Sequence, residues 1–197
     1  MIALQRPVAN MRSKRERATL RRDMWGLMLR FLFGRLTDGP RRGQALFDAV
    51  VAEARREHWY VEGEVMDSID GRFAALATIC ALFIVRLEEG GESGEAGSAD
   101  LTERFIEAMD SEHRELGLND PGLGRRVRKL VGSLERRVDD WRDAIHEETG
   151  WEETVVSSLY RGEPPRDSAL KHSSVALGDL WSGLLDAADS RLLEGQL

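Results

Sequence analysis

The chain has 197 residues, of which 42% are hydrophobic and 32% are charged, as in a single soluble globular domain. Its formal net charge of -7 argues against a general nucleic-acid-binding protein, because contacts with phosphates need a basic surface, and DNA is not an expected partner. Cys80 is the only cysteine, which excludes an intrachain disulfide and a cysteine-built zinc site and favours a reducing compartment, the cytoplasm.

The charge is unevenly distributed along the chain. Residues 1–42 hold 11 Lys and Arg against 3 Asp and Glu, whereas residues 43–120 hold 6 against 18. A second basic block, residues 121–142, holds 7 against 3. The sequence therefore predicts a basic amphipathic N-terminal arm over residues 1–42 and a mainly acidic helical domain over residues 43–197.

Apolar residues recur every three or four positions and show no sustained alternation, so we expect an all-α, single-domain bundle of six to seven helices. The first helix is predicted over residues 15–35 and the second over residues 44–58. The third runs from about Asp70 to Leu87 and is apolar on all sides, which predicts a central helix surrounded by the others. Its uncharged apolar run, residues 73–85, is shorter than the roughly 20 residues that a membrane span requires.

The acidic stretch 88–100 has almost no bulky apolar residue, so we expect a mobile loop there. The next helix is predicted to begin at Asp100 or Thr102 and to end at Gly117. Asp120 and Pro121 then have the residue types of an N-cap and a first helical position, and an amphipathic stripe of five turns follows them. The last predicted helices cover residues 151–160 and 173–193.

The sequence offers no recognisable catalytic motif and no cofactor fingerprint. None of the four histidines has a metal-ligand spacing, so we assign them structural or surface roles, and we expect no enzyme activity, no cofactor and no metal. Asp67 and Asp70 are spaced as a magnesium-binding pair would be, which leaves a metal-dependent helical enzyme as an alternative. The favoured interpretation is helix capping, in which Asp67 or Ser68 accepts N–H bonds from the first turn and Arg72 bridges back to these carboxylates.

The second basic block lies close to the predicted N-terminus of a helix, where the helix dipole also attracts anions. This arrangement would suit RNA or anionic lipid, and a solvated surface that pairs with the acidic body is the alternative. The block consists of Arg125, Arg126, Arg128 and Lys129. The N-terminal arm is similarly open to two interpretations, as an interfacial or polyanion-contacting element and as a core helix with a basic lead-in.

Two blocks of sequence, in the same order and at plausible spacing, together resemble the ubiquinol-cytochrome c chaperone family. The first block contains Val65-Met66-Asp67-Ser68-Ile69-Asp70-Gly71-Arg72-Phe73, and the second contains Arg114-Glu115-Leu116-Gly117 and Gly124-Arg125-Arg126-Val127-Arg128-Lys129-Leu130. The chain departs from the family pattern at Met66, where the family has Pro, at Ser68, where it has Thr, and at Thr78-Ile79, where it has Leu-His.

The resemblance implies a non-enzymatic assembly factor that binds newly made cytochrome b and helps it enter the ubiquinol-cytochrome c reductase complex. It also implies a ribosome or a small partner protein as further partners, and peripheral contact with the anionic inner face of the membrane by a cytoplasmic chain. Carried over residue by residue, the family pattern gives two candidate contact surfaces. One consists of Asp67, Asp70, Gly71, Arg72 and Phe73, and the other of Arg125, Arg126, Arg128 and Lys129.

Overall fold

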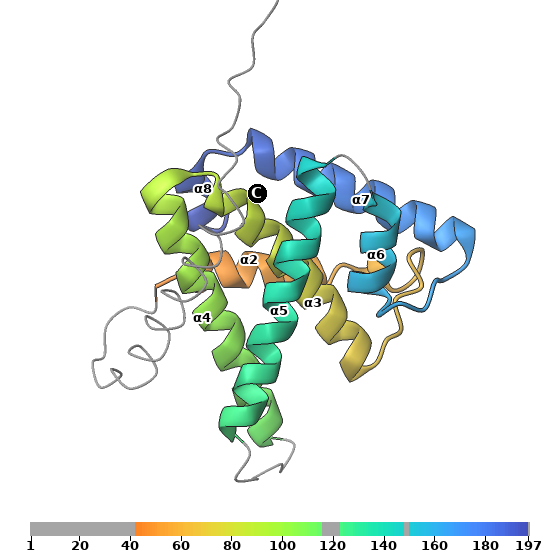
Figure 1. The fold of residues 1–197 in the computed structure, drawn as a ribbon, viewed down its shortest axis with the longest axis horizontal. Coiled ribbons are helices and arrows are strands. Elements are labelled where there is room, and N and C mark those ends of the chain that lie inside the picture. The colour runs from red at the N-terminus through yellow and green to blue at the C-terminus, as the bar shows by residue number, and fades with distance from the viewer. Residues whose placement is uncertain (1–41, 116–122, 148–149, 197) are drawn as a thin grey trace, which may run out of the picture. The chain divides into compact units, whose positions relative to one another are not determined.

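The computed structural model describes residues 42–115, 123–147 and 150–196, and the side chains of residues 110–128 lie outside that description. All regular structure in the described residues is helical, which confirms the predicted all-α bundle (Figure 1). The elements are α2 (Gln44–Ala54), the 3-10 helix η1 (Glu57–Trp59), α3 (Ile69–Glu88), α4 (Gly91–Glu115), α5 (Leu123–His146), α6 (Trp151–Leu159), α7 (Asp167–Asp186) and α8 (Asp189–Leu193).

The core of the bundle is α3, as its even apolarity predicts. It packs against α2, α4, α5, α6 and α7. Thirteen of its 20 residues are buried, among them Ile79, Cys80 and Phe83, which are fully inaccessible to solvent. A helix that is covered on every side needs apolar residues on every side, and this is why α3 shows no polar face.

The predicted mobile loop over residues 88–100 is wrong, because α4 begins at Gly91 rather than at Asp100 or Thr102. This stretch forms a helix because two of its glycines allow neighbouring elements to approach very closely. A Cβ at Gly94 would overlap the carbonyl oxygen of Leu87, and a Cβ at Gly97 would overlap the side chain of Leu193. These glycines therefore let the first turns of α4 lie against α3 and α8 without bulky apolar residues.

Other boundaries differ more modestly from the predictions. The second predicted helix ends at Ala54 and continues as η1, and the last one is divided into α7 and α8, with α7 starting at Asp167. The predicted helix over residues 15–35 and the predicted helix ends at Gly117 and Asp120 lie outside the described residues. No helix in the described part of the chain combines the length and the apolarity that crossing a membrane requires.

Candidate functional site

The start of α3 is capped as the sequence predicts. The Ser68 hydroxyl accepts a hydrogen bond from the backbone N–H of Gly71 at 3.2 Å. Arg72 bridges back to Asp67 at 2.6 Å, and this hydrogen bond lowers the pKa of the Asp67 carboxyl and raises the pKa of the Arg72 guanidinium. Both side chains are exposed, so this ion pair shapes the surface more than it stabilises the fold.

The other residues of the first candidate surface divide into one surface residue and two structural ones. Asp70 is exposed and pairs with Arg161, just beyond the end of α6, at 2.9 Å. Gly71 is buried, and a Cβ there would overlap the carbonyl oxygen of Met66. Phe73 is half-buried against the ring of Phe105 in α4, with a centroid separation of 5.9 Å. Gly71 and Phe73 therefore shape and anchor the site, and the charged residues are the ones that a partner can reach.

The magnesium alternative finds no support in this geometry. The carboxylates of Asp67 and Asp70 each form an ion pair with a different arginine. Within the described ranges, no three histidine, cysteine, aspartate or glutamate side chains come together in a way that could hold a metal ion. The capping interpretation is confirmed for Ser68 and for the bridge from Arg72 to Asp67, whereas the pairing of Asp70 with Arg161 was not predicted.

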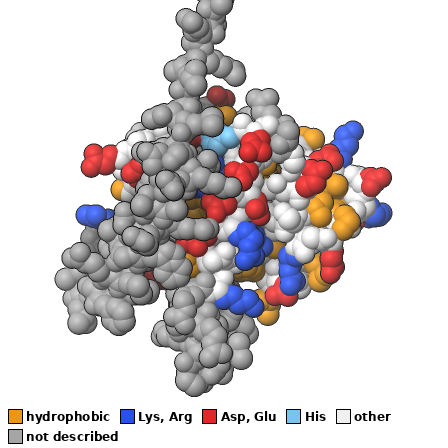
Figure 2. Space-filling view, in the orientation of Figure 1, with side chains coloured by type: hydrophobic (Ala, Val, Ile, Leu, Met, Phe, Trp, Pro, Cys, Tyr) orange, Lys and Arg blue, Asp and Glu red, His pale blue; other side chains and the backbone are white. Residues whose placement is uncertain are grey.

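Three large apolar side chains stand exposed in and beside the segment that joins η1 to α3. Val61 is 60% exposed, Met66 68% and Ile69 67%, and we call these three residues the apolar edge. Figure 2 shows hydrophobic side chains reaching the surface on the side of the molecule where this segment and α7 lie. The sequence analysis did not predict the apolar edge. A possible signal is that these apolar residues stand among acidic residues and glycine and do not follow a helical period.

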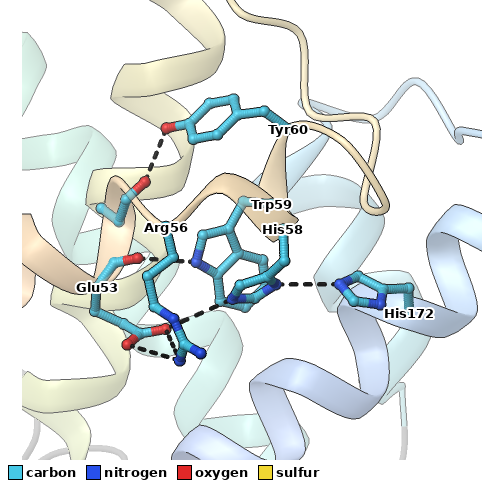
Figure 3. Close-up of polar contacts among 7 residues, drawn as sticks. Glu53, Arg56, His58, Trp59, Tyr60 and His172 are labelled. Carbon is cyan, nitrogen blue, oxygen red and sulfur yellow. Dashed lines mark hydrogen bonds and ion pairs between the residues drawn. The ribbon is translucent and has the colours of Figure 1, made fainter.

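The segment that carries the apolar edge is held firmly at several points. Trp59 is buried and its indole N–H donates to the Glu53 carbonyl at 2.9 Å, as Figure 3 shows. The Tyr160 hydroxyl donates to the Gly63 carbonyl at 2.6 Å, and Val65 is buried. The exposed apolar side chains are therefore presented from a fixed backbone.

A histidine pair ties the same region to α7. The Nδ1 atom of His58 in η1 lies 3.1 Å from the Nε2 atom of His172, and the other ring nitrogen of His58 lies 4.0 Å from a carboxylate oxygen of Glu53 (Figure 3). Glu53 is only 8% exposed and also pairs with Arg56 at 3.3 Å. Burial, together with Arg56 and His172, lowers the pKa of His58. The two histidines are 114 positions apart, so spacing along the sequence gives no sign of the pair.

The second candidate surface is only partly described. Arg125, Arg126 and Arg128 lie in the first turns of α5, their side chains outside the description, and Lys129 is exposed. Contact between this block and an anionic partner stays a prediction.

Comparisons with known proteins give one family and one solved structure. The sequence profile of the ubiquinol-cytochrome C chaperone family matches residues 61–195, a range that contains the apolar edge and helices α3 to α8. The chain is similar to the crystal structure of the Cbp3 homolog from Brucella abortus, with a TM-score of 0.69 and 20% sequence identity. The likeness covers 79% of this chain and 86% of that one, and at this identity it shows the fold alone. No curated protein matches the sequence significantly.

Proposed function

This chain belongs to the ubiquinol-cytochrome C chaperone family, and from that premise we propose that it binds newly made cytochrome b and delivers it to the ubiquinol-cytochrome c reductase complex. Family membership supports a chaperone or assembly role. The identity of the client, the absence of enzyme activity and a cytoplasmic position that touches the membrane peripherally are parts of the proposal.

The apolar edge is the observation that carries the proposal. Asp67 and Asp70, which directly follow Met66 and Ile69 in the sequence, form ion pairs with Arg72 and Arg161. An apolar centre with a polar rim is the usual anatomy of a protein-binding surface. A client that is itself a membrane protein has long apolar segments, which would bury Val61, Met66 and Ile69 on binding. Binding would remove apolar area of both proteins from water, and this contributes favourably to the free energy of binding.

The edge also overlaps the family-like motif, which supports a binding role for the charged residues of that motif. Asp67 and Arg72 would set the orientation of the client at the rim, while Gly71 and Phe73 hold the backbone in place beneath it. Arg125, Arg126, Arg128 and Lys129 are, in the same proposal, the contact site for an anionic partner, the ribosome or the membrane surface. A small partner protein completes the set of proposed partners.

The test replaces apolar edge residues with charged ones in the full chain. In the double variant Met66→Asp with Ile69→Asp, we expect capture of cytochrome b from solubilised membranes to fall roughly tenfold, because two apolar contacts are lost and two charges are brought to the interface. Both side chains are exposed, so the thermal midpoint should change little.

A matched control is Leu185→Asp, which places a charge at an exposed apolar position on α7 away from the motif and should leave capture unchanged. Undiminished capture by the double variant would show that the edge is not the client surface. The function itself is tested separately by deleting the gene. Unchanged cytochrome b and unchanged reductase activity in the deletion strain would overturn the assembly role.

A further inference from the structure

We propose that His58 and His172 form a pH-sensitive clamp, which ties η1 to α7 at neutral pH and loosens the segment after η1 when both rings are protonated. The clamp is defined by the two histidines and by the bond between them (Figure 3).

The geometry of the bond allows only certain protonation states. The His58 Nδ1 and His172 Nε2 atoms are 3.1 Å apart, which is a hydrogen-bond distance, and the rings are steeply inclined at 68°. A neutral imidazole has one donor and one acceptor nitrogen, so two neutral rings can bond, and so can one charged and one neutral ring. When both rings are charged, both facing nitrogens are donors. The bond is then lost, and two positive charges face each other.

The charged groups around the pair only partly compensate the two positive charges of the fully protonated form. Glu53, from α2, lies 4.0 Å from the far nitrogen of His58, but it is shared with Arg56, which also faces His58. Glu62, from the segment after η1, is the remaining carboxylate that favours the charged form of His58. On the α7 side, Lys171 and Asp179 line the same surface hollow as His172. This hollow exposes His172 to water, and the side chain of His58 is itself 21% exposed.

The sign of the pH effect follows from burial. Burial disfavours the charged form of His58 and lowers its pKa in the folded chain. The folded state therefore binds fewer protons than the open state at mildly acidic pH, and the stability of the closed clamp falls as the pH falls. Because the pKa of His58 is lowered in the folded chain, we expect opening as the pH falls below about 6.5, the ordinary value for histidine.

Release is expected to be local rather than global. The Gly63 amide donates to the His58 carbonyl at 2.9 Å, and the Val65 amide donates to the Trp59 carbonyl at 3.0 Å. These bonds close the segment onto η1, and η1 itself stays in the core, because Trp59 is buried and its indole N–H bonds the Glu53 carbonyl. The opening is therefore confined to the residues after η1. The released segment carries the apolar edge, so a pH-dependent affinity for the client also follows. That consequence alone rests on the proposed function.

The test is hydrogen–deuterium exchange on the full chain, corrected for the intrinsic effect of pH. We expect the Val61, Gly63 and Val65 amides to lose protection roughly tenfold between pH 7 and pH 5, because the hydrogen bond between the rings is lost. His172→Gln should abolish this change, because an amide offers both a donor and an acceptor near the position of Nε2 and can bond His58 in either state.

A second variant, His58→Asn, places an amide near the position of Nδ1 and should have the same effect. It keeps the proposal testable if His172→Gln does not fold. The control is His146→Gln, an exposed histidine on α5, which should behave as the unmodified chain does. Protection that does not change with pH in the unmodified chain, or an equal loss in the amide variants, would overturn the clamp. Neither result depends on the client.

Discussion

At the scale of single residues, the start of α3 shows how the path of the backbone fixes side-chain identity. The chain folds back after Met66, whose carbonyl oxygen accepts a hydrogen bond from the Ser68 amide at 2.8 Å. That carbonyl then lies where the Cβ of any residue other than glycine at position 71 would be. Glycine is required here because of this close approach, and its backbone angles are ordinary for a helix.

Gly71→Ala is therefore expected to lower the free energy of unfolding by about 2 kcal/mol, as the loop that carries Met66 must move away from the helix. Urea unfolding followed by circular dichroism measures the effect. The matched control is Gly178→Ala on α7, where the added Cβ would meet no atom within 4 Å apart from the adjoining backbone of its own helix. Alanine should stabilise that helix by about 0.5–1 kcal/mol. Equal effects at both positions would contradict the steric argument.

Local contacts could be predicted from sequence at this scale and distant ones could not. Ser68 as the cap of α3 and Arg72 as the partner of Asp67 both follow from short spacings, and the structure confirms them. Asp70 and Arg161 are 91 positions apart, and the histidine pair is separated still further. Such pairs are set by how helices pack, which a spacing rule does not contain.

At the scale of elements, Arg86 defines the corner between α7 and α8. Its guanidinium donates to the carbonyls of Leu184 and Ala187, both at 2.9 Å, and pairs with Asp189 at 2.9 Å. An arginine near the end of α3 therefore provides the hydrogen-bond donors for carbonyl groups at the end of α7. This contact accounts for the division of the last predicted helix, over residues 173–193, into two.

Arg86→Met is expected to destabilise the chain by about 3 kcal/mol, because two carbonyls and the Asp189 carboxylate lose their partner in a largely buried corner. Urea unfolding gives the total effect, and hydrogen exchange should place the largest loss of protection in residues 184–196. Arg191→Met, at an exposed arginine on α8, is the control and should cost little. A similar cost for both substitutions would show that the corner does not depend on Arg86.

The periodicity of apolar residues predicts the helices that pack through bulky side chains. It does not predict a helix that packs through glycine. The amphipathic stripe of α5 forms a helix, and the short helix predicted over residues 151–160 is observed as α6, Trp151–Leu159. The first ten residues of α4 were not predicted as helix, because Gly94 and Gly97 pack by leaving space for neighbouring atoms. A rule that counts large apolar residues assigns such a stretch to a loop.

At the scale of the whole described bundle, the burial of α3 makes its middle reachable only when the fold opens. Cys80 lies there, fully buried, and this burial raises the pKa of its thiol far above the usual range. A thiol reagent needs both access and a thiolate, and the native fold denies both. The sole cysteine of the chain is therefore a built-in reporter of global unfolding.

We expect the rate at which a disulfide reagent labels Cys80 in native buffer to equal the rate in urea multiplied by the equilibrium constant for unfolding. A chain that is stable by about 5 kcal/mol would thus react several thousand times more slowly when native. Moving the thiol to the exposed surface of α7, with Cys80→Ala and Ser182→Cys, should restore rapid labelling and shows that the reagent works in native buffer. Native labelling of Cys80 well above the calculated rate would mean that α3 becomes exposed without global unfolding. The central helix would then be a separate unit of opening, contrary to its contacts with every surrounding long helix.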